Sequence, residues 1–556
     1  MLETINKHRR WIVAAVFAAL LITGLAMLPS RTQGGDESCE THILEVNMKA
    51  YVDLLLPQES PLRKSLAEED DIATFLERDH GQAQSYWIWP FMKRAENSFQ
   101  RHWLYHFHVY AIFLLGLYAL YRIVLRLTGS WVWGLAGMGM LALNPRLFAE
   151  GFYNNKDSML LSLCLVVFWL GLAFVEKRSW TSCVWFGVAA AFAANTRVIG
   201  LGAFGAVGLL YLVYLTVQKK WDGRAFWRGV LAVGFFLLVF VLITPACWHD
   251  FFGFWGYYLG ASSNFDAARW NEWVLYRGAV YNPTENPVPW HYIPWFIAIT
   301  TPLVTLALAV LFPVLWVLRC KKDRAKWLSV ESLFCGMLAL FLGLPLLYAM
   351  LVRPNLYNGW RHFYFVYASI AVFAALAAFG LWQSRRVWLR RALAGVLGLH
   401  FVGCAVFIGV NFPNEYAYFN VLAGAHPEER YDADYWWISL PGVLEDILQM
   451  DPDARVCDVS KRPHLRQRWY ALRDEQPELY GEKAEENTWE RRWRCPYVLE
   501  NTSYWAIEKL HNNWTEDEIP QMERWIDELE TAPVIREWKC GDTVLWRLYE
   551  NPEYVG

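Results

Sequence analysis

The sequence predicts a polytopic α-helical membrane protein with about eleven transmembrane helices, followed by a small C-terminal α/β domain. Three observations lead to this prediction. Hydrophobic residues make up 55% of the 556-residue chain and charged residues only 19%, whereas soluble chains carry roughly 25% charged residues. The chain also contains 32 tryptophans, a residue that concentrates where a membrane meets water. Finally, apolar segments alternate with basic loops. The net charge of −3 gives no sign of a nucleic-acid partner.

The first apolar segment, residues 11–28, follows three basic residues. A signal peptide is the competing interpretation, but the segment is long for one and no clear cleavage site follows it. We therefore expect a retained helix. Further segments of roughly spanning length lie near residues 105–127, 131–149, 158–176, 180–196, 198–217, 229–246, 291–318, 329–352, 363–383 and 392–412.

The basic residues predict the orientation of these spans. Lysines and arginines occupy alternate loops on the side of the N-terminus, near residues 122–126, 177–178, 219–224, 321–326 and 385–391. Basic loops face the cytoplasm, so the N-terminus should be cytoplasmic, and an odd number of spans puts the C-terminus outside. We expect a multi-pass protein of the cell (inner) membrane with a periplasmic or extracellular C-terminal domain.

The chain divides into a membrane module, residues 1–412, and an outer domain, residues 413–556. The module has two long outer loops, 30–103 and 247–290, and the aromatic stretch FFGFWGYYLG in the second should form a helix lying in the interface. In the outer domain, VIREW and TVLWRLYE resemble strands, and the segment before them has helical spacing. This pattern predicts a small α/β domain.

Charged residues at the outer ends of the spans are candidates for a functional site, because charge facing lipid is costly. Asp36 and Glu37 follow the first span; the alternative is that this acidic pair lies in a solvated loop and has no functional role. Lys156 and Asp157 lie in NPRLFAEGFYNNKD at residues 144–157. Here Asp157 could serve a site, cap the next helix, or do both.

Cations occupy the same outer face. Arg197 lies between two apolar spans, where it could simply reach the headgroups. Arg361 and His362 lie in RPNLYNGWRHFYF, residues 353–365, and guanidinium groups suit phosphate, with lipid headgroups as the alternative ligand. Carboxylates beside cations suit a substrate with an anionic phosphate and a hydroxyl to be deprotonated, whereas a channel would need rings of one sign.

Five stretches carry a resemblance to a known group. They are GDESCETH, PRLFAEGFYNNKD, NPVPWHYIPWFIAITTPL, LYNGWRHFYFVYASIAVFAAL, and FPNEYAYFNVLAG followed by DYWW. In these stretches the chain resembles GT-C superfamily glycosyltransferases of the family 39-like group, which includes protein O-mannosyltransferases, aminoarabinose transferases and bacterial members of unassigned acceptor. Members of the group often have DYWG where this chain has DYWW, so the local turn should differ.

The resemblance implies transfer of a sugar from a polyprenyl-phosphate carrier, with inversion, on the outer face of the membrane. It implies that Asp36 takes the proton of the acceptor hydroxyl, with Glu37 and Asp157 as further acidic site residues. It also implies cations that bind the donor phosphate and offset its growing charge, namely Lys156, Arg197, Arg361 and His362. The residues expected to line the substrate are His42, His291, Tyr292 and Trp360.

No metal-binding spacing is evident, so we expect no metal cofactor, although Asp36, Glu37, His42 and His102 could bind a divalent ion. Two other functions stay open. A secondary transporter would show paired repeats and a midplane site, and a noncatalytic sensor or scaffold would bind a partner through its tail. The partners expected of a transferase are the donor lipid, the bilayer, and an unidentified glycan, lipid or protein acceptor.

Overall fold

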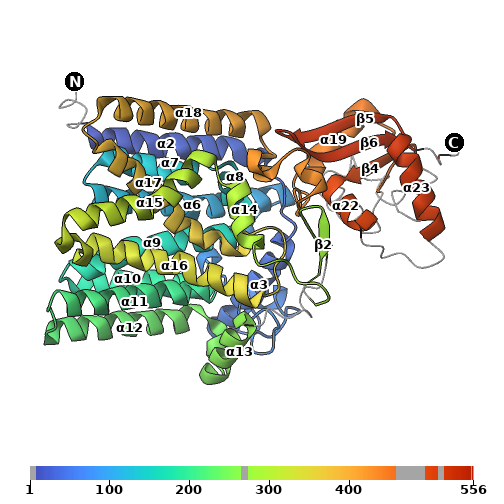
Figure 1. Ribbon diagram of the computed structural model, residues 1–556. Helices are drawn as coiled ribbons and strands as arrows, with labels where there is room; N and C mark the ends of the chain where they lie inside the picture. Colours follow the sequence, from blue (N-terminus) through green and yellow to red (C-terminus); the bar gives the residue numbers. More distant parts are fainter. Residues whose placement is uncertain are drawn as a thin grey trace.

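The computed structural model describes residues 8–263, 273–282, 284–458, 495–510, 519–551 and 554. Long helices lie side by side in one bundle (Figure 1). The C-terminal domain lies beyond one end of this bundle and the N-terminus lies at the other end. The two ends of the chain are therefore on opposite sides of the layer that the helices form.

Nine helices among the described residues are long and apolar enough to cross a membrane. Together with the small C-terminal sheet, they confirm the predicted class of fold. These helices are α2 (Arg9–Met27, extended by a 3-10 turn to Ser30), α6 (Ser98–Thr128), α9 (Asp157–Glu176), α11 (Ile199–Val217), α12 (Gly223–Ile243), α15 (Leu303–Lys322), α16 (Val330–Val352), α17 (Tyr367–Trp382, preceded by the 3-10 turn Arg361–Val366) and α18 (Val387–Asn411).

Three predicted spans differ from the observed helices. Residues 131–149 form α7 (Trp131–Ala142) and α8 (Pro145–Tyr153), because the Asn144 side chain accepts a hydrogen bond from the Leu147 amide at 3.2 Å and caps a new helix. Residues 180–196 form α10 (Trp180–Thr196), whose 17 residues are short for a span. The predicted span at 291–318 is interrupted at Pro302, between α14 (Tyr292–Thr300) and α15.

Helix α9 lies at the centre of the bundle, and its apolar stretch is largely covered by other helices. Small residues allow this close packing. A side chain at Gly116 of α6 would lie 2.6 Å from Ser162 of α9, so only glycine fits at that position. The N-terminus of α9 is thereby fixed at the end of the bundle that faces the C-terminal domain.

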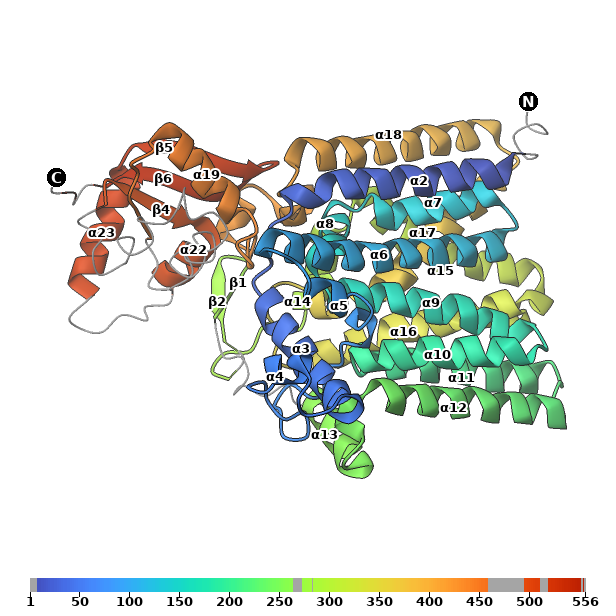
Figure 2. The same ribbon diagram turned by 180° about the vertical axis from the view of Figure 1, so that it is seen from behind.

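The two outer loops cover this same end, as Figure 2 shows from behind. The first loop forms α3 (Glu37–Leu55), α4 (Pro61–Ser65) and α5 (Trp89–Met92). The second forms α13 (Phe251–Ser263) and the hairpin of β1 (Val274–Tyr276) and β2 (Ala279–Tyr281). The predicted aromatic helix is thus present, and Phe252 on it is 84% exposed; its position in the membrane interface stays a prediction.

Among the described residues of the C-terminal domain, four strands form a sheet in the order β3-β4-β6-β5. Strands β3 and β4 are parallel, and the other two pairs are antiparallel. The predicted strands VIREW and TVLWRLYE are β5 and β6 and form a hairpin. The elements are α19 (Leu440–Met450), β3 (Val456–Asp458), β4 (Tyr497–Asn501), α22 (Thr502–Leu510), α23 (Ile519–Thr531), β5 (Val534–Cys540) and β6 (Thr543–Glu550).

Buried charges connect this domain to the bundle. Arg31, after α2, forms an ion pair with Glu415, after α18, and both side chains are fully buried. Asp434 accepts hydrogen bonds from the Ile438 amide at 3.0 Å and from the Trp546 indole of β6 at 3.1 Å. These bonds fix the DYWW turn to the sheet, and the Tyr435 hydroxyl, which donates to Glu150 Oε1 of α8 at 2.5 Å, fixes it to the bundle.

Candidate active site

Asp36 lies at the N-terminus of α3, directly after a Gly-Gly turn. Its Oδ2 accepts a hydrogen bond from Arg361 Nη1 at 2.6 Å. The Asp36 side chain is 46% exposed, whereas that of Arg361 is only 6% exposed. Burial acts to raise the pKa of Asp36, but the charge and hydrogen bond of Arg361, together with the charge of Lys156, hold this pKa below its usual value. Asp36 is thus an ionised carboxylate that solvent or a ligand can reach.

Asp157 is the second carboxylate of the site and is 1% exposed. Its Oδ1 lies 3.2 Å from Arg197 Nη2, and its Oδ2 lies 3.9 Å from Arg361 Nη1. It does not cap α9: its own amide donates to Asn154 Oδ1 at 2.7 Å, and neither of its carboxylate oxygens accepts a hydrogen bond from a described residue. The capping alternative is therefore wrong, and the carboxylate faces the two arginines.

Lys156 brings a third cation to the site. Its ammonium group forms an ion pair with Glu40 of α3 and lies 3.0 Å from His80 Nδ1. Although burial lowers the pKa of Lys156, the Glu40 carboxylate raises it above its usual value, so the side chain stays charged. Glu40 Oε2 also accepts a hydrogen bond from Gln82 Nε2 at 2.5 Å.

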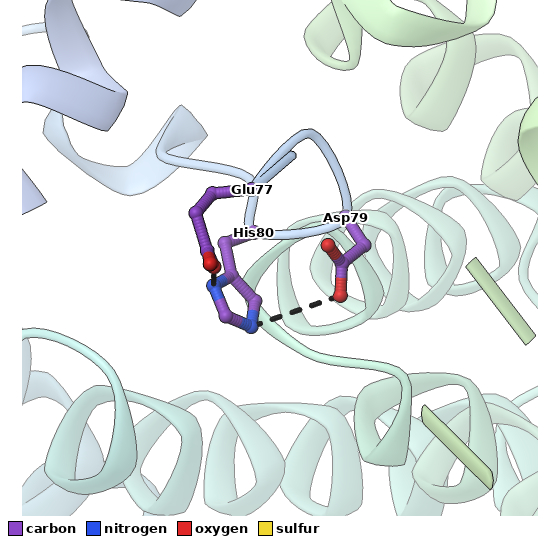
Figure 3. A group of neighbouring side chains, drawn as sticks. All are labelled: Glu77, Asp79 and His80. Carbon is purple, nitrogen blue, oxygen red and sulfur yellow. Dashed lines mark ion pairs between the residues drawn. The ribbon is translucent and has the colours of Figure 1, made fainter. Parts of the chain in front are cut away.

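Two acidic side chains flank His80 in the loop above α9 (Figure 3). Glu77 Oε2 lies 2.6 Å from His80 Nδ1, and Asp79 Oδ2 lies 3.7 Å from His80 Nε2. Among the described residues, this is the one group with metal-ligand spacing, and it contains none of the four residues predicted as possible metal ligands. With the Lys156 ammonium beside it, the cluster helps to hold that lysine in place.

Glu37 is held by two histidines of α6. Its Oε1 lies 2.6 Å from His102 Nδ1, and its Oε2 lies 3.0 Å from His106 Nε2. Burial raises the pKa of Glu37, but His106 and His102 together lower it to about 2. Both carboxylate oxygens are therefore engaged, which leaves Asp36 as the more accessible of the two adjacent acids.

Replacing Glu37 by glutamine should lower the melting temperature at neutral pH. A carboxylate with a pKa of about 2, against a usual 4.5, contributes stability above pH 4.5 that is lost as the pH falls toward 2. At about 1.4 kcal/mol per pKa unit, the contribution is about 3 kcal/mol. Thermal unfolding at pH 7 and pH 3 should show the gap between wild type and variant narrowing at pH 3. Glu59→Gln, at an exposed position of the same loop, is the control, and an equal gap at both pH values would contradict the prediction.

Aromatic side chains surround the Arg361 guanidinium. The rings of Trp436 and Tyr357 lie 4.8 and 5.2 Å from it, within range of a cation–π interaction. Trp436 comes from the DYWW turn, so the C-terminal segment completes the site. A small pocket at this point is lined by Gly34, Asp36, Glu37, Glu40, Tyr153, Asn154, Asn155, Lys156, Arg361 and Trp436.

The predicted substrate-lining residues lie outside this pocket. Tyr292 accepts a hydrogen bond from the Gly359 amide at 3.1 Å, and Trp360 donates to Thr300 Oγ1 at 2.7 Å, so both fix the segment that carries Arg361. His291 lies 2.6 Å from the Tyr276 hydroxyl of β1. His42 pairs with Glu69 and Asp70. Each of these side chains thus has a partner within the protein, and their contact with substrate stays a prediction.

His362, predicted to bind the donor phosphate, is next to Arg361 in sequence but is not part of the pocket lining. Its ring packs edge-to-face against Tyr357 with the ring centres 4.7 Å apart. In this position His362 supports the Tyr357 ring, and its contact with the donor phosphate stays a prediction.

Four residues of the site received little or no role from the sequence: Glu40, His102, His106 and Trp436. A signal was present for three of them. Asp36 and Glu40 lie four residues apart at the start of a helix, and so do His102 and His106 on α6, which places each pair on one helix face. Trp436 lies in the DYWW stretch of the resemblance, but its contact with Arg361 had no local signal, because the two residues are 75 positions apart in sequence.

Residues 101–345 match the model of glycosyltransferase family 87. This match indicates a glycosyltransferase of the GT-C type. It covers less than half of the chain, and it includes Lys156, Asp157 and Arg197 of the site but neither Asp36 nor Arg361. The nine candidate spans make the protein a multi-pass membrane glycosyltransferase.

Solved structures with some likeness include ArnT from Cupriavidus metallidurans in the apo state, with 13% identity over 98% of this chain and 99% of that chain, at a TM-score of 0.45. The structure of the same protein bound to undecaprenyl phosphate has 13% identity over 98% of this chain and 99% of that chain, at a TM-score of 0.43. Arabinosyltransferase EmbB from Mycobacterium smegmatis has 14% identity over 71% of this chain and 32% of that chain, at a TM-score of 0.36. These TM-scores lie below 0.5, so the likenesses decide neither fold nor function. A comparison with curated proteins finds no match.

Proposed function

We propose that this membrane glycosyltransferase moves a sugar from a polyprenyl-phosphate donor to an acceptor hydroxyl on the outer face of the membrane, with inversion, as the resemblance to family 39-like enzymes implies. The observation that carries the proposal is the contact between Asp36 and Arg361, with Lys156 and Arg197 close by. A carboxylate able to take a proton and cations able to hold a phosphate thus share one site. The N-terminus is then cytoplasmic and the C-terminal domain periplasmic or extracellular.

In this proposal residues 1–412 are the catalytic membrane module and residues 413–556 the outer domain. The acceptor oxygen attacks the anomeric carbon while Asp36 takes its proton. The bond from that carbon to the phosphate oxygen breaks, and its electron pair leaves with the phosphate. A single displacement from the opposite face inverts the anomeric carbon. The products are a glycoside and polyprenyl phosphate, with the proton on Asp36.

Arg361 couples donor binding to the basicity of Asp36. In the unliganded site its guanidinium contacts Asp36 and lowers the pKa of that carboxyl. A donor phosphate that binds Arg361 competes for the same N–H groups, so it weakens this ion pair. Asp36 then becomes a stronger base only when the sugar donor is present, which disfavours proton abstraction in an empty site.

An apolar groove in the membrane supports a polyprenyl carrier. It is a cavity of about 800 Å³ between α11, α15, α16 and α17, and its lining is almost wholly apolar. It begins at Ile199, two positions after Arg197, and extends along α11 past Gly205 to Val213. A long isoprenoid chain in this groove would have its phosphate at the level of the site cations.

The test of the function is a panel of polyprenyl-phosphate sugars offered to the purified protein in lipid nanodiscs. We expect one donor to be consumed, polyprenyl phosphate to be released, and the product to have the opposite anomeric configuration. Consumption of none in the presence of cell-envelope acceptors would refute the transferase and favour the sensor or scaffold alternative.

Filling the apolar groove should weaken the binding of donors with a long polyprenyl chain more than the binding of short-chain donors. A side chain at Gly205 meets open space, so Gly205→Phe occupies the groove without displacing backbone. We expect the KM for a full-length polyprenyl donor to rise at least tenfold, because apolar chain is displaced from the groove, while the KM for a two-isoprene analogue changes little. Gly234→Phe on α12, also with open space but outside the groove, is the control. Equal effects on both donors would count against a carrier in this groove.

A further inference from the structure

A second cavity, the interdomain groove, lies between the bundle and the C-terminal domain. It has a volume of about 550 Å³, within the range of small-molecule sites. Thr32 and His102 line it from the membrane module, Asn414 from the segment after α18, and Gly442 and Trp538 from the C-terminal domain. Its lining is about equally polar and apolar, unlike the groove in the membrane.

The inner wall of the interdomain groove adjoins the carboxylates. His102 lines the groove, and its Nδ1 lies 2.6 Å from Glu37 Oε1. Glu37 in turn lines the small pocket that contains Asp36. One pair of side chains therefore separates the interdomain groove from the proposed base, so a ligand in the groove can present a group to Asp36.

Two of the charged residues that line the groove, Arg31 and Asp446, are already engaged. Arg31 Nη1 donates to Glu415 Oε2 at 3.2 Å and to the Pro413 carbonyl at 3.0 Å. Asp446 Oδ2 accepts hydrogen bonds from Arg536 at 2.6 Å and from the Trp538 indole at 2.7 Å. His102 is held by Glu37, and Glu445 adds a further carboxylate. The lining thus disfavours an anionic ligand, which would need cations of its own.

The groups that remain suit hydroxyls and ring faces. The groove is lined by amide side chains such as Asn414 and Gln449, and Asn414 Oδ1 is buried without a hydrogen-bond partner among the described residues. Phe99, 58% exposed, offers an aromatic face in the same lining. Amides that bind hydroxyls, beside an apolar face that covers C–H groups, match the two faces of a neutral sugar ring.

We propose that the interdomain groove binds the acceptor and that this acceptor is a neutral carbohydrate whose hydroxyl reaches Asp36 past His102. The inference rests on the proposed function. It separates the two substrates: the lipid-linked donor enters from the membrane between α11 and α16, and the acceptor enters from the outer side between the bundle and the C-terminal domain.

Filling the interdomain groove tests its role. Gly442 meets open space at its side-chain position, so Gly442→Trp projects into the groove without a backbone clash. With a radiolabelled donor from the panel and cell envelopes as acceptor, we expect transfer to fall at least tenfold. The donor KM should stay within twofold. The control is Gly409→Trp on α18, also with open space at its side-chain position and outside the groove, which should transfer at the wild-type rate.

The outcomes separate the two proposals. If the wild type consumes no donor, the proposed function fails. If the wild type is active and Gly442→Trp transfers within twofold of it, only the acceptor groove fails. A matching loss in Gly409→Trp, or a melting temperature of Gly442→Trp well below that of the wild type, would attribute the loss to misfolding. Gln449→Trp, at a second position in the lining, then decides between misfolding and a blocked groove: a tenfold loss at the wild-type melting temperature supports the acceptor groove, and wild-type transfer overturns it.

The labelled product tests the class of acceptor. After mild acid removes unused donor, the product should pass through an anion exchanger at pH 7, resist protease and be shortened by periodate oxidation. Retention on the exchanger, or conversion to small labelled fragments by protease, would overturn the neutral carbohydrate and point to an anionic glycolipid or a protein.

Discussion

Replacing Asp36 by asparagine should abolish sugar transfer, with a fall in kcat of about 10²–10⁴-fold, the range expected when a positioned base is lost. The amide keeps the shape of the side chain but takes no proton. Arg361 keeps its contact with Asp157, so the cations proposed to bind the donor phosphate stay in place. The measurement is release of labelled sugar from the active donor, with donor binding followed separately by equilibrium dialysis.

The matched control is Asp53→Asn, which makes the same change on the same helix at a partly exposed position paired with Arg63. It should transfer sugar at the wild-type rate. Asp36→Asn should bind donor at least as well as the wild type, because Arg361 is released from a competing carboxylate. Wild-type turnover by Asp36→Asn would eliminate this residue as the base.

Replacing Arg361 by glutamine should reduce kcat/KM by about 10²–10³-fold, as for other groups that stabilise developing negative charge. It should also move the acid limb of the pH–rate profile to higher pH. Arg361 holds the pKa of Asp36 below its usual value, so its removal lets that pKa rise, and Asp36 becomes protonated and inactive at a higher pH than in the wild type.

Stability provides a third readout of Arg361→Gln. The variant removes the Arg361 contact of buried Asp157, which keeps Arg197 at 3.2 Å, so the free energy of unfolding should fall by less than about 3–5 kcal/mol, the loss typical of an uncompensated buried charge. Arg353→Gln, at the exposed end of α16 in the same sequence motif, is the control and should change neither rate nor stability. An acid limb that stays in place in Arg361→Gln would show that this arginine does not act on the base.

The helical class of the fold was predictable because spanning segments have a strong local signal. Long apolar segments and alternate basic loops identified the membrane module, and the strands VIREW and TVLWRLYE were recognised from local pattern. The breaks at Asn144 and Pro302 also had local signals, a cap residue and a proline, but hydropathy alone averaged over them.

The charged residues of the site could be predicted because a charged side chain at the end of a span is costly if it faces lipid, so its presence there indicates a function. Asp36, Asp157, Arg197 and Arg361 converge through ion pairs, and the charge of Lys156 acts on Asp36. His42 and His291 lie in or near the same motifs and have local partners, so their contact with substrate stays a prediction. Closeness in sequence to a site residue does not fix the direction of a side chain.

The sequence by itself determined the membrane class, the charged motifs and the end of the bundle where the site lies, because hydropathy and charge act through local composition. Tertiary structure alone decided three further points: that Asp157 faces two arginines instead of capping α9, that two histidines engage Glu37, and that Trp436 covers Arg361. These contacts join segments up to hundreds of positions apart. Coulombic attraction and packing fall off with distance in space, and only the folded chain sets that distance.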